Sequence, residues 1–390
     1  MDHFEQEKMK QAKRLVLFFT FDVSLQTWLE TGLFAREVEL YRRLIKNGWD
    51  VTFLTYGTNN DLELAKKISP IKVVPLFKKW RPSNPIIRLV LSPFLIFKAR
   101  KLIKNCSVLK TNQIWGGWNA VLARWVWGRP LVVRGGYEPY AFSIHQNQPK
   151  PRQIFTKLMT GLCYRNADAV FLATKEDLDF AKTHFSIHTQ EIYIRSNWVD
   201  TEHFRPSLKK RSALEILYVG RFNSQKNLTT LIKSLANSDY ILHLVGDGEQ
   251  RHELEELAEK VSVSAIFHGR LPNDVLSKFM AEFEIFALPS LFEGNPKVLI
   301  ESMSAGLAIA ATDSPGINSL IRHNETGVLC PPSEEGLRRA IDSLAASKNF
   351  RMSIGKKARS YILEHHSLTS FANEEERILS SLAEKKYDET

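Results

Sequence analysis

Short apolar runs alternate with helical patterns from the beginning of the chain. Residues 15–21 form a continuous apolar run, which is typical of a strand in a parallel sheet covered on both faces. Thr31 and Gly32 open a helical pattern in which apolar residues recur every three or four positions as far as Leu44. A second apolar run follows at 51–55. The pattern predicts one βαβ unit at the start.

The same alternation continues through both halves of the chain. Further short apolar runs lie at 71–75, 107–109, 130–133, 169–173, 216–219, 242–245, 266–268, 285–288 and 307–311. Helical stretches separate these runs, as a doubly wound parallel sheet requires. At 390 residues the chain exceeds what one hydrophobic core usually serves, so we predict an α/β fold with two Rossmann-like domains.

The segment at 197–210 interrupts the alternation. It contains Pro206 and a basic cluster but no clear periodicity, and a fresh strand begins at Ile216. We therefore predict a first domain over residues 1–205 and a second over residues 206–367. A helical pattern starts at Leu368, so residues 368–390 are predicted to form a C-terminal helix.

Composition and charge narrow the class of protein. With 44% hydrophobic and 25% charged residues, the sequence is typical of a globular protein. Its three cysteines are far apart and its charged N-terminus lacks the apolar core of a signal peptide, so we expect a cytoplasmic location. The net charge of +10 comes from scattered basic residues without a recognisable nucleic-acid-binding module, so nucleic acid is not an expected partner.

The longest apolar run covers residues 86–97. Arg88 and Pro93 break it, and it is shorter than the roughly 20 residues that a membrane-spanning helix needs, so it is not expected to cross a bilayer. Basic residues flank it between 78 and 104. Two interpretations stay open, a segment lying on an anionic membrane surface and a partly buried helix with a solvated basic edge.

Two cations lie on one predicted loop of the second domain. Gly220 ends a strand, and Arg221 and Lys226 follow it before the next helix. A diphosphate leaving group gathers negative charge as its bond to a sugar breaks, so two fixed cations beside it would stabilise the transition state. A solvated turn would carry the same residues, and the spacing alone leaves both interpretations open.

Two strand-to-helix turns in this half are candidate binding sites. In the turn at 246–248, glycines let a ligand approach the backbone, although the turn's own conformation can also require them. In the second turn, Asn295 suits a helix N-cap, Pro296 the first helical position and Gly306 the residue past the helix end. Free N–H groups at this helix start can bind a phosphate or sugar oxygen, and Lys297 would add charge.

Two glutamates belong to the second turn. Glu293 stands just before the helix and Glu301 lies inside it, eight positions later. The two carboxylates can therefore touch different parts of one ligand. A pair of solvated side chains would show the same spacing, so both interpretations remain.

Taken in order, these motifs resemble the retaining glycosyltransferases of family 4, which have the GT-B fold. The resemblance rests on VGRFNSQKN at 219–227, LVGDGEQR at 244–251, FHGRLPNDVL at 267–276, LPSLFEGNPKVLIESMSAG at 288–306 and NETGVLCPP at 324–332. SNWVDTEHFRP at 196–206 is similar to the family's interdomain passage. The resemblance implies two Rossmann-like domains facing across a cleft. It further implies that the first domain binds the acceptor, the second binds the nucleotide sugar, and the last helix crosses back to the first domain.

Carried over residue by residue, the resemblance implies a donor site. Arg221 and Lys226 would bind the donor diphosphate, Glu301 the ribose hydroxyls and Glu293 the donor sugar. Arg221, Lys226 and Glu293 would be the catalytic residues. The other implied donor-binding positions are Gly32, Gly220, Gly246, Arg270, Leu271, Asn295, Pro296, Lys297 and Val298. Of these, residues 295–298 would surround the sugar and phosphates with their backbone, and residues 270–271 would border the base.

The first domain departs from the family pattern. Its first loop, FDVSLQTWLETG, lacks the usual paired glycines, and VVRGGYEPY stands where many members carry a histidine. Arg134, Tyr137 and Glu138 are therefore candidate acceptor contacts, and Arg134 has the alternative role of supporting the loop. No residue is assigned as a catalytic base.

The resemblance implies transfer of a hexose-type sugar from a nucleoside diphosphate to a hydroxyl acceptor with retention of anomeric configuration. No metal and no cofactor beyond this co-substrate are expected. A saccharide or lipid-linked saccharide in cell-surface polysaccharide synthesis would serve as acceptor, at the inner face of a membrane. Two alternatives stay open, an inactive relative that binds a saccharide or a partner, and a sugar-nucleotide epimerase of similar architecture.

Overall fold

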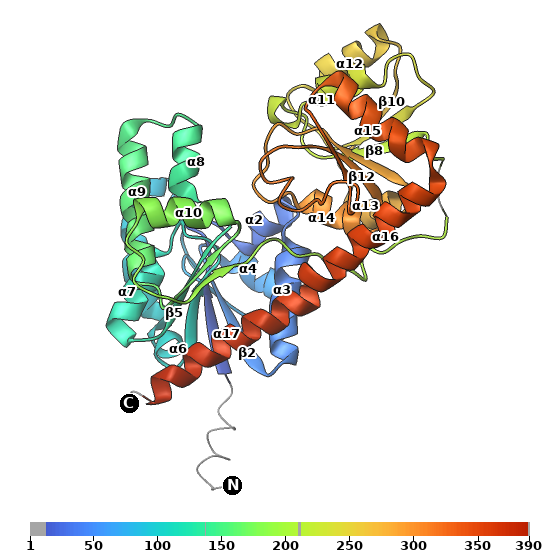
Figure 1. The fold of residues 1–390 in the computed structure, drawn as a ribbon. Helices are drawn as coiled ribbons and strands as arrows, with labels where there is room; N and C mark the ends of the chain where they lie inside the picture. Colours follow the sequence, from blue (N-terminus) through green and yellow to red (C-terminus); the bar gives the residue numbers. More distant parts are fainter. Residues whose placement is uncertain (1–12, 137, 210–211, 389–390) are drawn as a thin grey trace, which may run out of the picture. The chain divides into compact units, whose positions relative to one another are not determined.

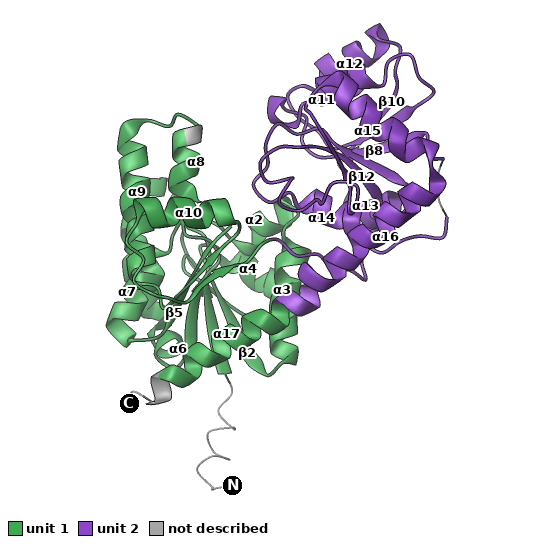
Figure 2. Ribbon diagram, in the orientation of Figure 1, with its two compact units in different colours: residues 1–196, 372–390 green, residues 197–371 purple. Residues whose placement is uncertain are grey.

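The computed structural model describes residues 13–136, 138–209 and 212–388. Tyr137, one of the candidate acceptor contacts, lies outside the described residues. The chain divides into two compact units (Figure 2). Unit 1 contains the described residues up to Ser196 together with those from Ala372 onward, and unit 2 contains Asn197–Phe371. The first passage between the units therefore lies a few residues before the boundary that we predict at 205/206.

Unit 1 is built on a parallel sheet of seven strands in the order β3-β2-β1-β4-β5-β6-β7. Its strands are β1 (Lys13–Phe18), β2 (Trp49–Thr55), β3 (Lys72–Pro75), β4 (Val108–Thr111), β5 (Leu131–Gly135), β6 (Ala169–Leu172) and β7 (Ile192–Ile194). Its helices are α2 (Leu25–Glu30), α3 (Phe34–Lys46), α4 (Asn59–Lys66), α5 (Pro85–Leu95), η1 (Ile96–Ala99), α6 (Arg100–Lys104), α7 (Trp118–Trp127), α8 (Pro139–His145), α9 (Lys150–Arg165) and α10 (Lys175–His184). Strands β4, β5 and β6 are buried along their whole length, as the strands of a sheet covered on both faces must be.

Unit 2 repeats the design with a parallel sheet of six strands in the order β10-β9-β8-β11-β12-β13 (Figure 1). Its strands are β8 (Glu215–Val219), β9 (Ile241–Val245), β10 (Ser264–Gly269), β11 (Ile285–Leu288), β12 (Ala308–Thr312) and β13 (Val328–Cys330). Its helices are η2 (Ser224–Lys226), α11 (Leu228–Ser234), α12 (Arg251–Lys260), α13 (Asn273–Ala281), α14 (Lys297–Ser304), α15 (Glu334–Ala346) and α16 (Lys348–His365). The last helix, α17 (Leu368–Asp388), begins in unit 2 and continues into unit 1.

Each sheet reverses its strand order at one point. In unit 2 this point lies between β8 and β11, which pair in parallel although they are far apart in the chain. Open α/β sheets bind ligands at the carboxyl ends of the strands beside such a reversal. The loops that follow β8 and β11 are therefore the expected position of a binding site in this unit.

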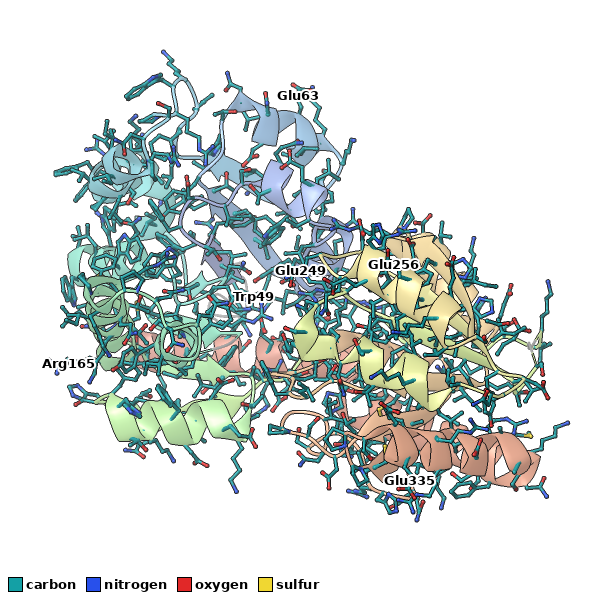
Figure 3. All side chains as sticks on the ribbon, turned by 90° about the horizontal axis from the view of Figure 1, so that it is seen from above. Trp49, Glu63, Arg165, Glu249, Glu256 and Glu335 are labelled. Atoms are coloured by element: carbon teal, nitrogen blue, oxygen red, sulfur yellow. The ribbon has the colours of Figure 1, made fainter. Side chains whose placement is uncertain are left out.

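Apolar side chains fill both units, and Figure 3 shows the side chains of the described residues. Trp49, at the start of β2, is only 2% exposed. Glu256 of α12, by contrast, has a side chain that is 70% exposed.

Within the described part of the chain, no helix combines the length and the hydropathy that a membrane-spanning segment needs.

Four elements differ from the sequence-based expectation. The first loop holds an extra helix, α2, whose start is fixed by Ser24 and Thr27, because each side chain hydrogen-bonds the other residue's backbone N–H. Strands β7 and β13 have only three residues each, too few for an apolar pattern to stand out. Helix α14 begins at Lys297 with Pro296 as its N-cap, so the prediction of Asn295 as N-cap and Pro296 as first helical residue is wrong. Gly306 follows this helix with a φ of 76°, as predicted.

Candidate functional site

The loop after β8 presents the two predicted cations differently. Arg221 is exposed, and its carbonyl accepts a hydrogen bond from the Tyr218 hydroxyl at 3.0 Å. Lys226 ends the short helix η2, and its side chain is 17% exposed. Asn227 then takes a left-handed conformation with a φ of 52°, which asparagine tolerates better than most residues, and α11 starts immediately after it. The loop thus holds one solvent-exposed cation, Arg221, and one largely buried cation, Lys226.

Lys226 is anchored by Glu293 from the loop after β11. The Lys226 ammonium donates to Glu293 Oε1 at 2.6 Å, and the Ser290 hydroxyl donates to the same oxygen at 2.7 Å. The Glu293 side chain is 8% exposed, so the pair lies at the edge of the protein surface and not deep inside it. The two loops that the strand reversal brings together therefore share one ion pair.

Further hydrogen bonds join these two loops. The Leu291 N–H donates to the Gln225 carbonyl at 2.9 Å, and the Gln225 side-chain amide donates to the Phe292 carbonyl at 2.8 Å. The Asn227 amide donates to the Pro289 carbonyl at 3.2 Å. The backbone of both loops is thus held in one arrangement, which keeps the geometry of the Lys226–Glu293 pair.

A third segment, which follows β12, also holds Glu293 in place. The sequence motifs do not include this segment. The hydroxyls of Thr312 and Ser314 donate to the Ser290 carbonyl at 2.5 and 2.8 Å, and the Glu293 N–H donates to the Pro315 carbonyl at 2.8 Å. Gly316 has a φ of 78°, and a Cβ atom there would lie 2.1 Å from the Glu293 carbonyl oxygen. The adjacent Pro315-Gly316 dipeptide was the signal that could have indicated a tight turn.

Helix α14 carries a second ion pair across its first turn. Lys297 Nζ lies 2.9 Å from Glu301 Oε1, the favourable i,i+4 spacing on a helix, and the Glu301 side chain is 6% exposed. Val298, also predicted to line the site, is half-buried on the same turn. The first N–H groups of a helix have no partner within it, so the start of α14 offers backbone donors next to these two charges.

Asn295 has a supporting role that its predicted N-cap function did not include. Its backbone carbonyl accepts a hydrogen bond from the Asn197 side-chain amide at 2.7 Å, and its own side chain accepts one from the Asn197 N–H at 3.4 Å. Both residues belong to unit 2. Asn197 therefore fixes the segment between Glu293 and α14.

The glycine turn after β9 is explained by packing within the protein. Gly246 has a φ of 139°, and a Cβ atom there would lie 1.8 Å from the Gly220 carbonyl oxygen. Gly246 must therefore be glycine because the loop after β8 lies against it. Glu249, labelled in Figure 3, is exposed at the end of the same turn. Arg270 is exposed and Leu271 half-buried just after β10, the neighbouring strand.

The remaining described candidates belong to unit 1. Gly32 is exposed in the short link between α2 and α3, with a φ of 72°. Arg134 is buried at the end of β5 and pairs with Glu37 of α3 at 3.4 Å, which favours its alternative role as a support of the loop. Glu138 is the N-cap of α8 and accepts a hydrogen bond from the Ala141 N–H, and burial raises the pKa of its carboxyl to about 7.

Known proteins share both halves of this architecture. The sequence profile of the family described as glycosyl transferases group 1 matches residues 199–361, and that of glycosyltransferase family 4 matches residues 36–203. A Campylobacter jejuni enzyme, named as a 4-alpha-N-acetylgalactosaminyltransferase acting on a diphospho-undecaprenol-linked saccharide, is 28% identical over 72% of this chain and 79% of its own.

Solved structures show the same fold at lower identity. Sucrose-phosphate synthase of Thermosynechococcus elongatus superimposes with a TM-score of 0.73 at 18% identity, over 95% of this chain and 99% of its own. HepE of Anabaena, solved with UDP and glucose, gives a TM-score of 0.70 at 16% identity, over 94% and 99% of the two chains. Both comparisons agree with the two parallel sheets described above.

Proposed function

Since the chain belongs to the family 4 glycosyltransferases with the GT-B fold, we propose that it transfers a hexose-type sugar from a nucleoside diphosphate to a hydroxyl acceptor with retention of configuration. The observation that carries this proposal is the Lys226–Glu293 pair at the strand reversal of unit 2, with exposed Arg221 on the same loop. These loops lie where open α/β sheets bind their ligands.

In this proposal Arg221 and Lys226 stabilise the departing diphosphate. An ammonium group has three donors, so Lys226 can keep Glu293 on one of them and offer the others to phosphate oxygens. Arg221 presents a guanidinium fork that suits two phosphate oxygens at once. Two cations on one loop would supply the charge that a metal ion supplies in other transferases, so the proposed reaction needs no metal. The leaving phosphate itself would accept the proton of the incoming hydroxyl.

The remaining donor contacts are proposed around α14. Glu301 is buried and rigid enough to accept hydrogen bonds from the ribose hydroxyls, with Lys297 beside it to hold its orientation. The N–H groups at the start of α14 would bind sugar or phosphate oxygens. Glu293 would face the donor sugar, and Arg270 and Leu271 would border the base. Gly32 belongs to unit 1, and its role in donor binding stays a prediction from the resemblance.

The acceptor is proposed to be a lipid-linked saccharide of cell-surface polysaccharide synthesis. The name of the Campylobacter relative describes action on such a saccharide. Glu138 and Arg134 would contribute acceptor contacts from unit 1, and the enzyme would work on the cytoplasmic side as a peripheral protein of the inner membrane face. A buried carboxyl with a pKa of about 7 can donate or accept a hydrogen bond to a sugar hydroxyl near neutral pH.

The direct test is to incubate the protein with UDP-, GDP- and ADP-sugars and to measure thermal stabilisation and slow donor hydrolysis. Glu301→Ala should abolish both responses, whereas Glu256→Ala, on the exposed face of α12, should leave them unchanged. Stabilisation without hydrolysis or transfer would indicate a binding relative, and conversion of one nucleotide sugar into another would indicate an epimerase. With a turnover substrate in hand, NMR of the product anomer would decide between retention and inversion.

A further inference from the structure

Helix α5 exposes an apolar stripe and buries polar residues, unlike an ordinary surface helix. Ile86, Val90 and Phe94 follow one another at four-residue spacing and are 67%, 59% and 69% exposed, while Arg88 and Ser92 are buried. A surface helix of a globular protein normally buries its apolar stripe and exposes its polar one. Together with Ile87 and Phe97, which are 45% and 43% exposed, these residues form what we call the apolar face.

Hydrogen bonds on the inner side hold the helix in this orientation. Arg88 forms an ion pair with Asp22 at 2.6 Å and also donates to the Pro82 carbonyl. The Ser92 hydroxyl accepts from the Asn119 side-chain amide at 3.0 Å. Turning the helix to bury its apolar stripe would break these bonds and leave buried polar groups without partners. The outward apolar face is therefore fixed by the fold of unit 1.

The stretch of chain that contains the apolar face is strongly basic, although Asp22 of the first loop pairs with its Arg81 and Arg88. Residues 64–137 contain 15 of the chain's 53 Lys and Arg residues and none of its 43 Asp and Glu residues. The exposed cations at the two ends of α5 are Lys78, Lys79, Arg81, Lys98, Arg100, Lys101 and Lys104, of which Arg81 pairs with Asp22. Trp80, 66% exposed, lies among the first of them. Tryptophan and lysine beside an apolar stripe are typical of a helix at the boundary between lipid headgroups and acyl chains.

We propose that the apolar face docks on an anionic lipid surface, with α5 lying in the plane of the interface and the flanking cations on the headgroups. Charge favours this occupant over a second copy of the chain, because a symmetric pair would place the same basic residues opposite one another. The face lies in unit 1 and contains no residue assigned to donor binding, so this proposal stands apart from the proposed reaction.

The test is flotation of the full chain with vesicles of phosphatidylcholine alone or mixed with phosphatidylglycerol. Binding should require phosphatidylglycerol and weaken as added salt screens the charges. The combined variant Ile86→Gln, Val90→Gln, Phe94→Gln should bind at least about tenfold more weakly, as should Lys98→Gln, Lys101→Gln, Lys104→Gln. The matched controls, Met352→Gln and the pair Lys356→Gln, Lys357→Gln, change exposed residues of α16 and should bind like the wild type.

Three outcomes would overturn the proposal. These are no binding to anionic vesicles, binding that both combined variants retain, and concentration-dependent self-association that only the apolar variant loses. Thermal unfolding and hydrolysis of a donor without acceptor serve as checks, because both should be unchanged in every variant. If the wild-type chain binds vesicles but hydrolyses no donor, that result would count against the proposed reaction and not against the membrane proposal.

A label distinguishes insertion from loose electrostatic contact. The native cysteines Cys106, Cys163 and Cys330 are buried, so an environment-sensitive fluorophore on Phe94→Cys reports on that position. Anionic vesicles should shift its emission to the blue, and the same label on Met352→Cys should not respond. An unshifted emission from the first label would exclude insertion of the apolar face.

Discussion

Two lysine–glutamate pairs in this molecule have the same chemistry and opposite surroundings. Lys226 and Glu293 lie at the loop edge of unit 2, with side chains 17% and 8% exposed. Lys110 of β4 and Glu375 of α17 pair inside unit 1, and both side chains are 0% exposed. Burial lowers the pKa of Lys110, although the nearby carboxylate of Glu375 opposes the shift.

The difference lies in what each pair can do besides binding its partner. The buried pair is surrounded by protein, with Arg195 near Glu375 at 3.8 Å and the Tyr41 hydroxyl near Lys110 at 3.4 Å. Its charges can act only on the fold. In the proposed reaction, the pair at the loop edge offers its remaining N–H donors to the diphosphate of the nucleotide sugar. The two pairs contain the same residue types and differ in solvent access. Solvent access therefore distinguishes the structural ion pair from the proposed catalytic one.

The largest effect is expected from Glu375→Ala. Removing one partner leaves Lys110 as an uncompensated buried charge, which should lower the free energy of unfolding by about 3–5 kcal/mol. Seven of the eight tryptophans lie in unit 1, so denaturation followed by tryptophan fluorescence reports on this unit. The double variant Lys110→Met, Glu375→Leu should recover much of the loss. A single variant as stable as the wild type would contradict the structural role of the pair.

Lys226→Ala should reduce activity strongly without changing the stability of unit 1. The turnover rate should fall by about 10²–10³-fold, since a fixed donor to the developing charge is lost. The unfolding of unit 1 should not change. Lys233→Ala is the control, because Lys233 forms a more exposed pair with Glu334 in the same unit. A rate within a few fold of wild type would remove Lys226 from the proposed mechanism.

Glu138 provides a third case, a buried carboxyl whose pKa is raised chiefly by burial. Its pKa in the folded state is about 7, above the ordinary value of 4.5, so the folded chain binds a proton more tightly than the unfolded chain. Stability should therefore fall as the pH rises from about 4.5 to about 7, by at most about 3 kcal/mol. Glu138→Gln, which keeps an acceptor for the Ala141 N–H, should flatten this slope in denaturation curves measured across that range. Equal slopes in both proteins would show that the Glu138 carboxyl is not the group responsible.

Gly316→Ala tests the backbone support of Glu293 and should lower both stability and donor affinity. A left-handed conformation costs a side chain about 1–2 kcal/mol, and the new methyl group must also displace the Glu293 carbonyl. Donor affinity should fall with it, as titration with the nucleotide sugar would show. Gly294→Ala is the matched control, because a Cβ atom there meets nothing within 4 Å. Equal donor affinity in the two variants would mean that the backbone support of Glu293 is dispensable.

The apolar pattern located most strands because a buried parallel strand is apolar throughout. The run at 285–288 coincides with β11, which is buried along its length. The run at 107–109 was cut short because β4 continues through Lys110 and Thr111, both buried. The buried charge of Lys110 is paired by Glu375, which is 265 positions away, so the local pattern cannot indicate it.

The motifs located the charged residues of the candidate site but not their supports. Arg221, Lys226, Glu293 and Glu301 stand in short contiguous motifs, so a resemblance can carry them. The hydroxyls of Thr312 and Ser314 donate to the Ser290 carbonyl, and the Ser290 hydroxyl donates to the Glu293 carboxylate. Such contacts leave no periodic signal in the sequence. The cap of α14 was misplaced by one residue because Asn295 bonds Asn197 instead of the helix.

Helix α17 also sets an order of events during synthesis on the ribosome. The strands of unit 1 emerge before those of unit 2, yet Lys110 meets its counter-charge only when Glu375 has left the exit tunnel. Lys13 of β1 likewise waits for Ser380, whose hydroxyl it reaches at 2.7 Å. All of unit 2, residues 197–371, leaves the exit tunnel before that moment. The unit translated first is therefore the unit completed last, and a nascent chain stalled before α17 would hold a lysine in an apolar sheet with no carboxylate to receive it.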